Sequence, residues 1–147
     1  MSKKIYLKLK IVILGDSSTN KTEFLSTFSG NQEQSLTTLG LDVMNKYIQI
    51  DDMLITLVIY DTVERENFKN YVPETLKGAH GAIYLYDITN KSSFEKLKQK
   101  YINNIEEKYR NVKFIITGNK IDLNEHREVS KEEVLKFCEE KIWNILK

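Results

Sequence analysis

The 147-residue sequence has little cysteine, little proline and no long apolar run. Its single cysteine, Cys138, excludes a disulfide framework and fits a reducing compartment. No stretch approaches the roughly 18 apolar residues that a membrane-spanning helix needs. The N-terminal segment lacks the apolar stretch and small-residue cleavage site of a signal peptide. We therefore expect a cytoplasmic protein.

A strong charge of either sign is also absent. The 22 lysines and arginines nearly balance the 21 aspartates and glutamates, and the net charge is +1. This balance creates no field that would draw the chain to nucleic acid or to an anionic membrane, so we expect no nucleic-acid partner. The length suits one domain with a real core and is too short for two, so residues 1–147 are expected to form a single domain.

Apolar runs and helix-like segments alternate along the chain. Five apolar runs have the length of strands and lie at residues 5–14, 47–50, 54–60, 82–86 and 112–117. The polar turn at residues 51–53 predicts an antiparallel hairpin between the second and third runs. Alternating strands and helices predict an α/β fold, in which a mainly parallel sheet has helices on both faces and the hairpin supplies one antiparallel edge strand.

Local signals predict where the helices begin. Helical spacing starts at Lys21, and Ser92 or Ser93 can cap a helix that runs to Tyr109. Ser130 with Glu133 three residues later is a capping box that opens the last helix. The only proline, Pro73, predicts a helix opening at its segment. Residues 31–38 are polar and are expected to form a loop.

A candidate phosphate-binding loop runs from Gly15 to Thr22, between the first strand and the first helix. Backbone N–H groups and a helix N-terminus converge on an anion at such a place. Lys21 would reach the β and γ phosphates, and the Thr22 hydroxyl would ligate Mg²⁺. Asn20 stands where the pattern has glycine, but asparagine tolerates positive φ better than other side chains. A polar connection with a capping residue is the alternative explanation.

Asp61 closes the third apolar run. An acidic residue at such a strand end can hold a Mg²⁺-bound water beside Thr22. Aspartate at a strand end is also a common helix or turn cap, so this signal gains weight only with the other motifs.

A candidate base-binding group, Asn119-Lys120-Ile121-Asp122, follows the apolar run at residues 112–117. Asp122 can accept two hydrogen bonds from a base with adjacent N–H and NH₂ groups, which guanine has and adenine lacks. Lys120 can lay its alkyl stem along the ring, and Asn119 can tie the loop to a neighbouring segment. An ordinary polar turn is the alternative explanation.

Together these motifs resemble the Ras superfamily of small GTPases, and the Rab branch most closely. The resemblance covers residues 9–137 and includes residues 77–94, which look like the Rab stretch through the fourth strand. The segment Thr38-Leu39-Gly40-Leu41-Asp42 looks like the Rab effector segment, although Val43 follows where phenylalanine is expected. The resemblance implies a P-loop NTPase fold with six strands, a GDP/GTP switch with Mg²⁺, and a role in vesicle trafficking.

The resemblance also implies which residues form the site. Mg²⁺ would be held by Thr22, Thr38 and Asp61. Effectors and exchange factors would bind through Thr38–Val43 and Asp61–Tyr71, and would allow a cytoplasmic protein to reach vesicle membranes. Nucleotide contacts would come from Gly15, Asp16, Ser17, Ser18, Thr19, Asn20, Lys21, Thr22, Glu23, Asn119, Lys120, Asp122 and Leu123.

The second switch departs from the family pattern Trp-Asp-Thr-Ala-Gly-Gln-Glu. Glu64 replaces the glycine whose N–H meets the γ-phosphate, and brings a negative charge toward an anion. Arg65 replaces the glutamine that orients the attacking water, although an arginine can stabilise transition-state charge. With Thr38, Arg65 is the candidate catalytic residue, and we expect slow or absent GTP hydrolysis.

The family pattern also extends past Lys147. We expect the chain to lack the family's last strand and last helix, its Ser-Ala-Lys loop and a C-terminal prenylation cysteine. Three hypotheses remain open at this point: a guanine-nucleotide switch with impaired hydrolysis, a pseudo-GTPase that serves as an interaction module with little nucleotide binding, and a competent GTPase in which Arg65 or a partner positions the water.

Overall fold

The computed structural model of the chain describes residues 4–30, 41–62, 71–102, 109 and 111–145. Within these residues a five-stranded sheet has the order β2-β3-β1-β4-β5. Its strands are β1 (Ile5–Leu14), β2 (Leu41–Ile50), β3 (Met53–Thr62), β4 (Gly81–Asp87) and β5 (Lys113–Asn119). Only β2 runs antiparallel to its neighbour, so the predicted α/β fold and its antiparallel edge strand are confirmed.

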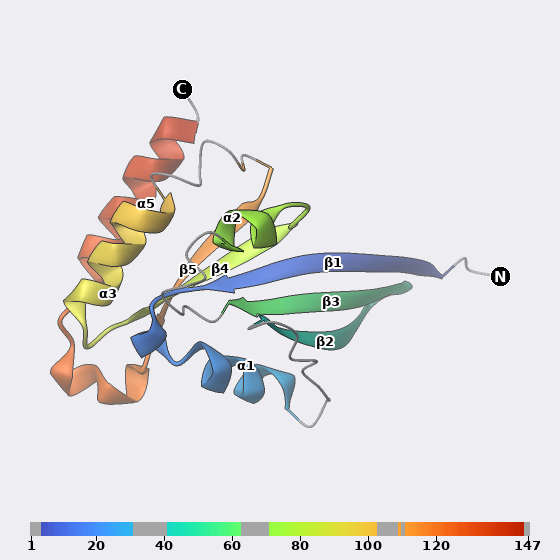
Figure 1. Ribbon diagram of the computed structural model, residues 1–147, viewed down its shortest axis with the longest axis horizontal. Coiled ribbons are helices and arrows are strands. Elements are labelled where there is room, and N and C mark those ends of the chain that lie inside the picture. Colours follow the sequence, from blue (N-terminus) through green and yellow to red (C-terminus); the bar gives the residue numbers. More distant parts are fainter. Residues whose placement is uncertain (1–3, 31–40, 63–70, 103–108, 110, 146–147) are drawn as a thin grey trace.

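Helices cover both faces of the sheet, as predicted (Figure 1). Helix α1 (Lys21–Ser29) packs on one face, where Leu25 meets Ile13, Ile59 and Leu85. The opposite face carries α2 (Tyr71–Leu76), α3 (Lys91–Lys96) and α5 (Lys131–Ile145). Alternate residues of β1, β3 and β4 supply the two cores, because successive strand side chains point to opposite faces.

Short helical segments complete the described chain. They are the 3₁₀ turn η1 (Ser17–Thr19), the π-helical turn η3 (Leu97–Ile102) that continues α3, and the 3₁₀ segment η4 (Ile121–His126). Pro73 lies in the first turn of α2, as its φ restriction favours. None of the described helices has the length and apolar character to cross a membrane. The polar segment 31–38, expected to be a loop, lies outside the described residues.

Two element boundaries differ from the sequence prediction. Strand β2 begins at Leu41 rather than Tyr47, because all ten of its residues pair with β3. Helix α3 begins at Lys91 with Asn90 at the N-cap, so neither Ser92 nor Ser93 is the cap. The Ser93 hydroxyl is instead buried and accepts a hydrogen bond from the Asp87 N–H at 2.9 Å. Pairing with β3 therefore sets the start of β2, whereas the contacts that use Ser93 at the start of α3 are local.

Of the two reciprocal hydrogen bonds of a capping box, the start of α5 shows the one from the Glu133 N–H to the Ser130 side chain. The Glu133 N–H donates to the Ser130 hydroxyl at 3.1 Å, which satisfies one of the N–H groups that a helix start leaves unpaired. The Glu133 carboxylate turns instead toward Lys91 and Lys98 of the neighbouring helix.

Gly118, next to the end of β5, provides a test of this packing. A Cβ there would lie 2.7 Å from the Tyr86 hydroxyl oxygen and 2.8 Å from a methyl carbon of Ile88. We expect Gly118→Ala to lower the free energy of unfolding by about 1–3 kcal/mol, as overpacking does, measured by urea denaturation. Gly81→Ala is the control, since its closest neighbour is the flexible end of Ile11 at 3.2 Å. Equal losses in both variants would contradict the packing argument.

Candidate nucleotide-binding site

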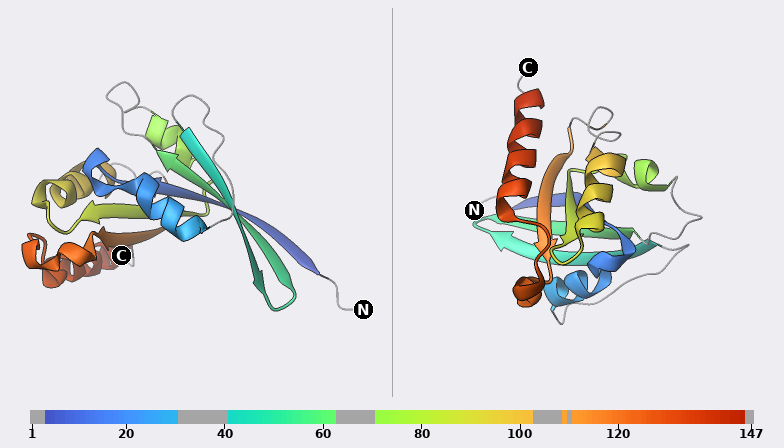
Figure 2. Two further views of the ribbon diagram at one scale, coloured as in Figure 1. Left: turned by 90° about the horizontal axis from the view of Figure 1, so that it is seen from below. Right: turned by 90° about the vertical axis from the view of Figure 1, so that its left-hand side faces the viewer.

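The carboxyl ends of four parallel strands meet at one edge of the sheet, which faces the viewer in the right-hand view of Figure 2. Gly15 follows β1, Asp61 lies near the end of β3, Asp87 ends β4 and Asn119 ends β5. Strand β1 pairs with β3 on one side and with β4 on the other, so the strand order changes direction at β1. Ligands of open α/β sheets bind at such a reversal of strand order.

Gly15 cannot be replaced without moving the backbone at this edge. Its φ is +151°, and a Cβ would lie 2.5 Å from the Leu85 carbonyl oxygen of β4. The chain then turns through η1, whose start is capped by the Asp16 carboxylate accepting from the Ser17 N–H at 2.9 Å. The predicted loop is therefore a tight turn pressed against β4.

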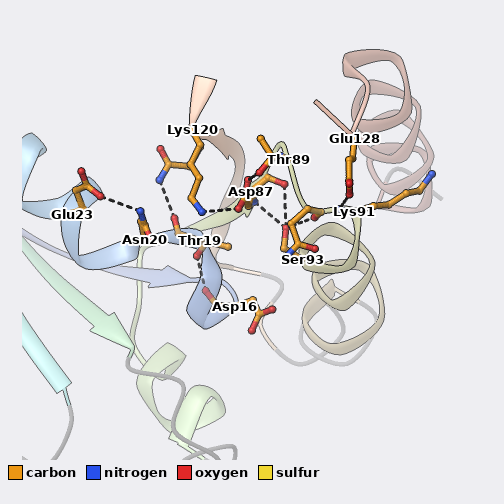
Figure 3. A network of polar contacts seen from close by, with 12 residues as sticks. Asp16, Thr19, Asn20, Glu23, Asp87, Thr89, Lys91, Ser93, Lys120 and Glu128 are labelled. Carbon is orange, nitrogen blue, oxygen red and sulfur yellow. Dashed lines mark hydrogen bonds and ion pairs between the residues drawn. The ribbon is translucent and has the colours of Figure 1, made fainter. Parts of the chain in front are cut away.

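Asn20 adopts the left-handed conformation that the glycine of the pattern would take, with φ 55° and ψ 46°. Its side chain does not lie across the loop. The amide donates to a Glu23 carboxylate oxygen at 3.0 Å, one turn along α1 (Figure 3). The expectation that asparagine tolerates this position is confirmed, and the added bulk lies toward Glu23.

The ammonium group of Lys21 lies at the mouth of the loop. The side chain is 6% exposed, and Nζ donates to the carbonyl oxygens of Gly15 at 2.6 Å and Asp16 at 3.1 Å. Just beyond it, the first N–H groups of α1 have no partner within the helix. A cation and a helix N-terminus therefore face the same space, which is an arrangement suited to an anion.

Thr22 and Asp61 meet beside this space. The Thr22 hydroxyl donates to Asp61 Oδ2 at 2.9 Å, while Asp61 Oδ1 is buried without a hydrogen-bond partner among the described residues. Burial raises the pKa of the Asp61 carboxyl above its ordinary value; the Thr22 hydrogen bond and Lys21 oppose this rise, and Asp42 adds to it. The pKa of this carboxylate is raised in spite of Lys21, and one of its oxygens is unpaired among the described residues, so it suits Mg²⁺, which prefers oxygen ligands.

A cavity of about 540 Å³ opens at this end of the site. It lies between the start of α1 and the end of β3. Its lining residues are Ser17, Asn20, Lys21, Thr22, Glu23, Ser26, Asp61 and Thr62. The cavity is therefore lined by the candidate phosphate-binding residue Lys21 and by the candidate metal ligands Thr22 and Asp61.

The candidate base-binding group, Asn119 to Asp122, lies against the candidate phosphate-binding loop. The Asn119 side-chain amide donates to the Thr19 carbonyl at 2.9 Å and so ties the end of β5 to the loop after β1, as the sequence suggested. Lys120 has φ 66° and ψ 39°, and its Nζ lies 2.7 Å from Asp87 Oδ2. Asp122, in the first turn of η4, is exposed to solvent, as is Leu123. Asp122 can therefore accept hydrogen bonds from a ligand.

The sequence analysis missed the role of Asp87. The carboxyl is 3% exposed and accepts hydrogen bonds from Lys120 and from both the N–H and the hydroxyl of Thr89. Burial raises the pKa of this carboxyl, but the bonds from Lys120 and Thr89 and the Lys120 charge outweigh it, so the pKa is below its ordinary value. Asp87 ends an apolar run just as Asp61 does, and that signal could have found it.

A second missed contact joins α3 to the phosphate loop. Lys96 Nζ lies 2.8 Å from Asp16 Oδ2. Burial raises the pKa of Asp16, but hydrogen bonds from Lys96 and Ser17, together with the charges of Lys96 and Lys21, outweigh it and lower that pKa. No spacing in the sequence relates residues 80 positions apart, so this pair was not predictable from a local pattern.

The structure thus brings most of the predicted site residues to one edge. Residues 15–23, Asp61 and residues 119–123 lie there together. Thr38, Glu64 and Arg65, the predicted switch residues, lie outside the described residues.

Comparison with known proteins agrees with this geometry. The sequence model described as "Ras family" matches residues 10–146, which is nearly all of the chain. The chain belongs to the Ras family. The fold of this Ras-family chain is accordingly that of a P-loop GTPase, with the described sheet containing five strands.

Individual relatives identify the branch of the family. The chain is 38% identical to the Ras-related protein Rab-1 of Theileria parva over 141 residues, which cover 93% of this chain and 64% of that protein. It is 38% identical to the Ras-related proteins Rab-8 of Diplobatis ommata and Rab-8B of Homo sapiens over 135 residues, covering 90% of this chain and 64% and 65% of those proteins. The chain is therefore Rab-like, and spans just under two thirds of the length of these relatives.

The opposite pKa shifts of Asp61 and Asp87 lead to opposite predictions for stability. The pKa of Asp61 is raised, so its ionised form opposes folding at pH 7, and this cost falls as the pH drops through the raised pKa toward the ordinary value of 3.8. We expect Asp61→Asn to stabilise the nucleotide-free, metal-free protein at pH 7, and by less at pH 4.5.

Asp87→Asn is the matched comparison. The pKa of Asp87 is lowered, so its ionised form favours folding above the ordinary carboxyl pKa, and this contribution is lost as the pH falls through the lowered value. We expect Asp87→Asn to destabilise the protein at pH 7. Thermal unfolding in EDTA measures both variants, and a loss of stability in Asp61→Asn at pH 7 would contradict the assignment of a charge whose burial outweighs the Thr22 and Lys21 contacts.

Proposed function

We propose that this chain binds guanine nucleotide with Mg²⁺ and acts as a Rab-like GDP/GTP switch in which hydrolysis is slow or impaired. The observation that carries the proposal is the hydrogen bond from Asn119 to the Thr19 carbonyl at 2.9 Å. It joins a candidate base-binding group to a candidate phosphate loop 100 residues away in sequence. One ligand with a base at one end and phosphates at the other would contact both.

At the phosphate end, the N–H groups of residues 15–23 would bind the phosphate oxygens. Lys21 would move its ammonium from the Gly15 and Asp16 carbonyls toward the β and γ phosphates, which offer a stronger partner than a neutral carbonyl. Asn20 leaves room for this contact because its side chain is held by Glu23.

Thr22 and Asp61 would hold Mg²⁺, with Thr38 as a further ligand by resemblance. The unpaired Oδ1 of Asp61 supports this assignment. Bound Mg²⁺ neutralises phosphate charge and fixes the orientation of the phosphate chain. The Asp61 carboxylate would then gain a directly bound cation in addition to the charge of Lys21.

At the base end, Asp122 would accept from the adjacent N–H and NH₂ groups of guanine. The exposed carboxylate of Asp122 is open to such a ligand, and the stem of Lys120 would lie along the ring. Adenine lacks this donor pair, so the proposal includes guanine selectivity. Leu123 follows in the same turn and would contact the base.

The second switch supports the proposal of impaired hydrolysis. Glu64 places a carboxylate where the family has glycine, and like charge near the γ-phosphate disfavours GTP. Arg65 cannot accept a hydrogen bond from an attacking water as the family glutamine does.

The alternative is a pseudo-GTPase that presents a fixed surface with little nucleotide binding. The observation that favours it is the charge of Glu64 together with the internal bonds of Lys21 and Lys120. In both proposals, effectors and exchange factors would bind through Thr38–Val43 and Asp61–Tyr71, and these partners would bring the protein to vesicle membranes.

Nucleotide titration separates the two proposals. Purified protein is stripped of nucleotide and titrated with fluorescent GDP and GTP analogues, with and without Mg²⁺. We expect saturable binding that Mg²⁺ strengthens, with GDP preferred to GTP. Absence of saturable binding at micromolar nucleotide would exclude the switch and favour the interaction module.

Base selectivity tests Asp122 directly. Asp122→Asn replaces a charged acceptor with a neutral amide, and we expect GDP affinity to fall by about ten- to a hundred-fold, the value of a hydrogen bond to a charged group. An amide can donate to the C2 carbonyl of xanthine, so the same variant should gain affinity for xanthosine diphosphate. Unchanged selectivity would show that Asp122 does not read the base.

Single-turnover GTP hydrolysis tests the second switch. The wild-type rate is expected to be close to that of GTP in buffer, and Glu64→Gly combined with Arg65→Gln should raise it by restoring a γ-phosphate contact and a water acceptor. A flat rate in the double variant, with GTP binding intact, would contradict the assignment of these two residues as the lesion.

A further inference from the structure

We propose that Asp87 is a positioning residue for guanine binding, which acts by holding the Lys120 ammonium so that the lysine stem lies across the base-binding end of the site. This inference rests on the proposed function and adds a residue to it. Asp87 belongs to β4, outside both the phosphate loop and the Asn119–Asp122 group. Figure 3 shows the contact between the two side chains.

The contact joins a fixed anion to a movable cation. Asp87 Oδ2 and Lys120 Nζ are 2.7 Å apart, and the side chains are 4% and 24% exposed. A lysine side chain has several rotatable bonds, so an exposed one samples many positions. A buried carboxylate at hydrogen-bond distance restricts the ammonium to one of them.

The position of the Asp87 carboxylate is itself fixed by its neighbours. Oδ1 accepts from the Thr89 N–H at 2.8 Å and the Thr89 hydroxyl at 2.7 Å. The Asp87 N–H donates to the buried Ser93 hydroxyl. With one carboxylate oxygen held by Thr89, the other is directed at Lys120.

The backbones of the two residues are held in register. Asp87 is paired with Asn119, the residue before Lys120, at the end of the β4–β5 ladder. Lys120 then takes the left-handed conformation, its φ being 66°, and its carbonyl accepts from the Leu123 N–H at 2.9 Å. Positive φ is unfavourable for lysine and persists where several contacts fix it. Asp87 supplies the side-chain contact among these.

The expected consequence is preorganisation. In the part of the chain that the structure describes, Asp87 is the partner of the Lys120 ammonium. A ligand that meets a lysine already held in place loses less conformational freedom on binding. Without Asp87 the ammonium would still be present, but its stem would have to be ordered by the nucleotide.

A double-mutant cycle on GDP affinity tests the proposal. Asp87→Asn keeps the side-chain shape and an acceptor for Thr89 but removes the charge, while Lys120→Met keeps the stem and removes the ammonium. We expect each single variant to weaken GDP binding by about ten-fold, and the double variant to bind no more weakly than Lys120→Met alone. The measurement that decides is whether the two losses of GDP affinity add, because a general loss of stability from Asp87→Asn would lower GDP affinity both with and without the Lys120 ammonium.

Glu133→Gln is the control for removing a carboxylate that pairs with lysines. Glu133 lies 3.8 Å from Lys91 Nζ and 3.7 Å from Lys98 Nζ, away from the base-binding group. Its GDP affinity should match that of the wild type. Thr89→Val is the second variant if Asp87→Asn fails to fold, because it removes the hydroxyl that orients the same carboxylate. Thr89→Val should weaken GDP binding by less than Asp87→Asn does, and it should have no effect on GDP affinity when Lys120 is already replaced by methionine.

The outcomes distinguish this inference from the proposed function. If the losses from Asp87→Asn and Lys120→Met multiply to about a hundred-fold, or if Asp87→Asn leaves GDP affinity unchanged, Asp87 does not act through Lys120 and the inference is overturned alone. If Thr89→Val has the same effect with and without the Lys120 ammonium, the inference is likewise overturned. If the wild-type protein binds no GDP, the proposed function fails and this role fails with it.

Discussion

The pairing of β1 with β3 on one side and with β4 on the other, extended by β5 beside β4, brings the described parts of the candidate site to one edge. Because the three strands are parallel, their carboxyl ends meet at one edge, and the loop after β1 turns there against the Leu85 carbonyl. Asp61 of β3 accepts a hydrogen bond from Thr22 at the start of α1, while Asp87 ends β4 and accepts one from Lys120. The absence of a side chain at Gly15 allows this approach, since a Cβ would lie 2.5 Å from the carbonyl oxygen.

Two buried carboxylates at this edge differ in one physical respect, which is a direct hydrogen bond from a cation. Asp87 has the Lys120 ammonium at 2.7 Å, and its pKa is lowered in spite of burial. Asp61 has a hydroxyl on one oxygen and no hydrogen-bond partner on the other among the described residues, and its pKa is raised by burial. The charge of Asp87 is therefore balanced by a partner within the protein, whereas the charge of Asp61 would be stabilised by an added cation.

Local signals in the sequence predicted the parts of the site that depend on local chemistry. A glycine after a strand, an asparagine able to take positive φ at position 20, and a polar group after the last strand are visible without a structure. The strand order, the pairing of Lys120 with Asp87 and that of Lys96 with Asp16 join distant residues and have no local signature. The early start of β2 was missed for the same reason, because its first residues are in a strand only through pairing with β3.

The base-binding and phosphate-sensing ends of the site depend on different contacts, so one can be retained while the other is altered. Asn119, Lys120 and Asp87 are fixed by the β4–β5 ladder and by the bonds to Thr19 and Thr89. These described contacts come from β4, β5 and the loops that follow β1 and β4. In the proposed switch, a substitution in the second switch would therefore alter the response to the γ-phosphate while the contacts that hold Asn119, Lys120 and Asp87 remain. In the proposed switch, selectivity for guanine would depend on groups that the sheet holds in place, whereas hydrolysis would depend on the switch loops, so the first could be kept where the second is slow.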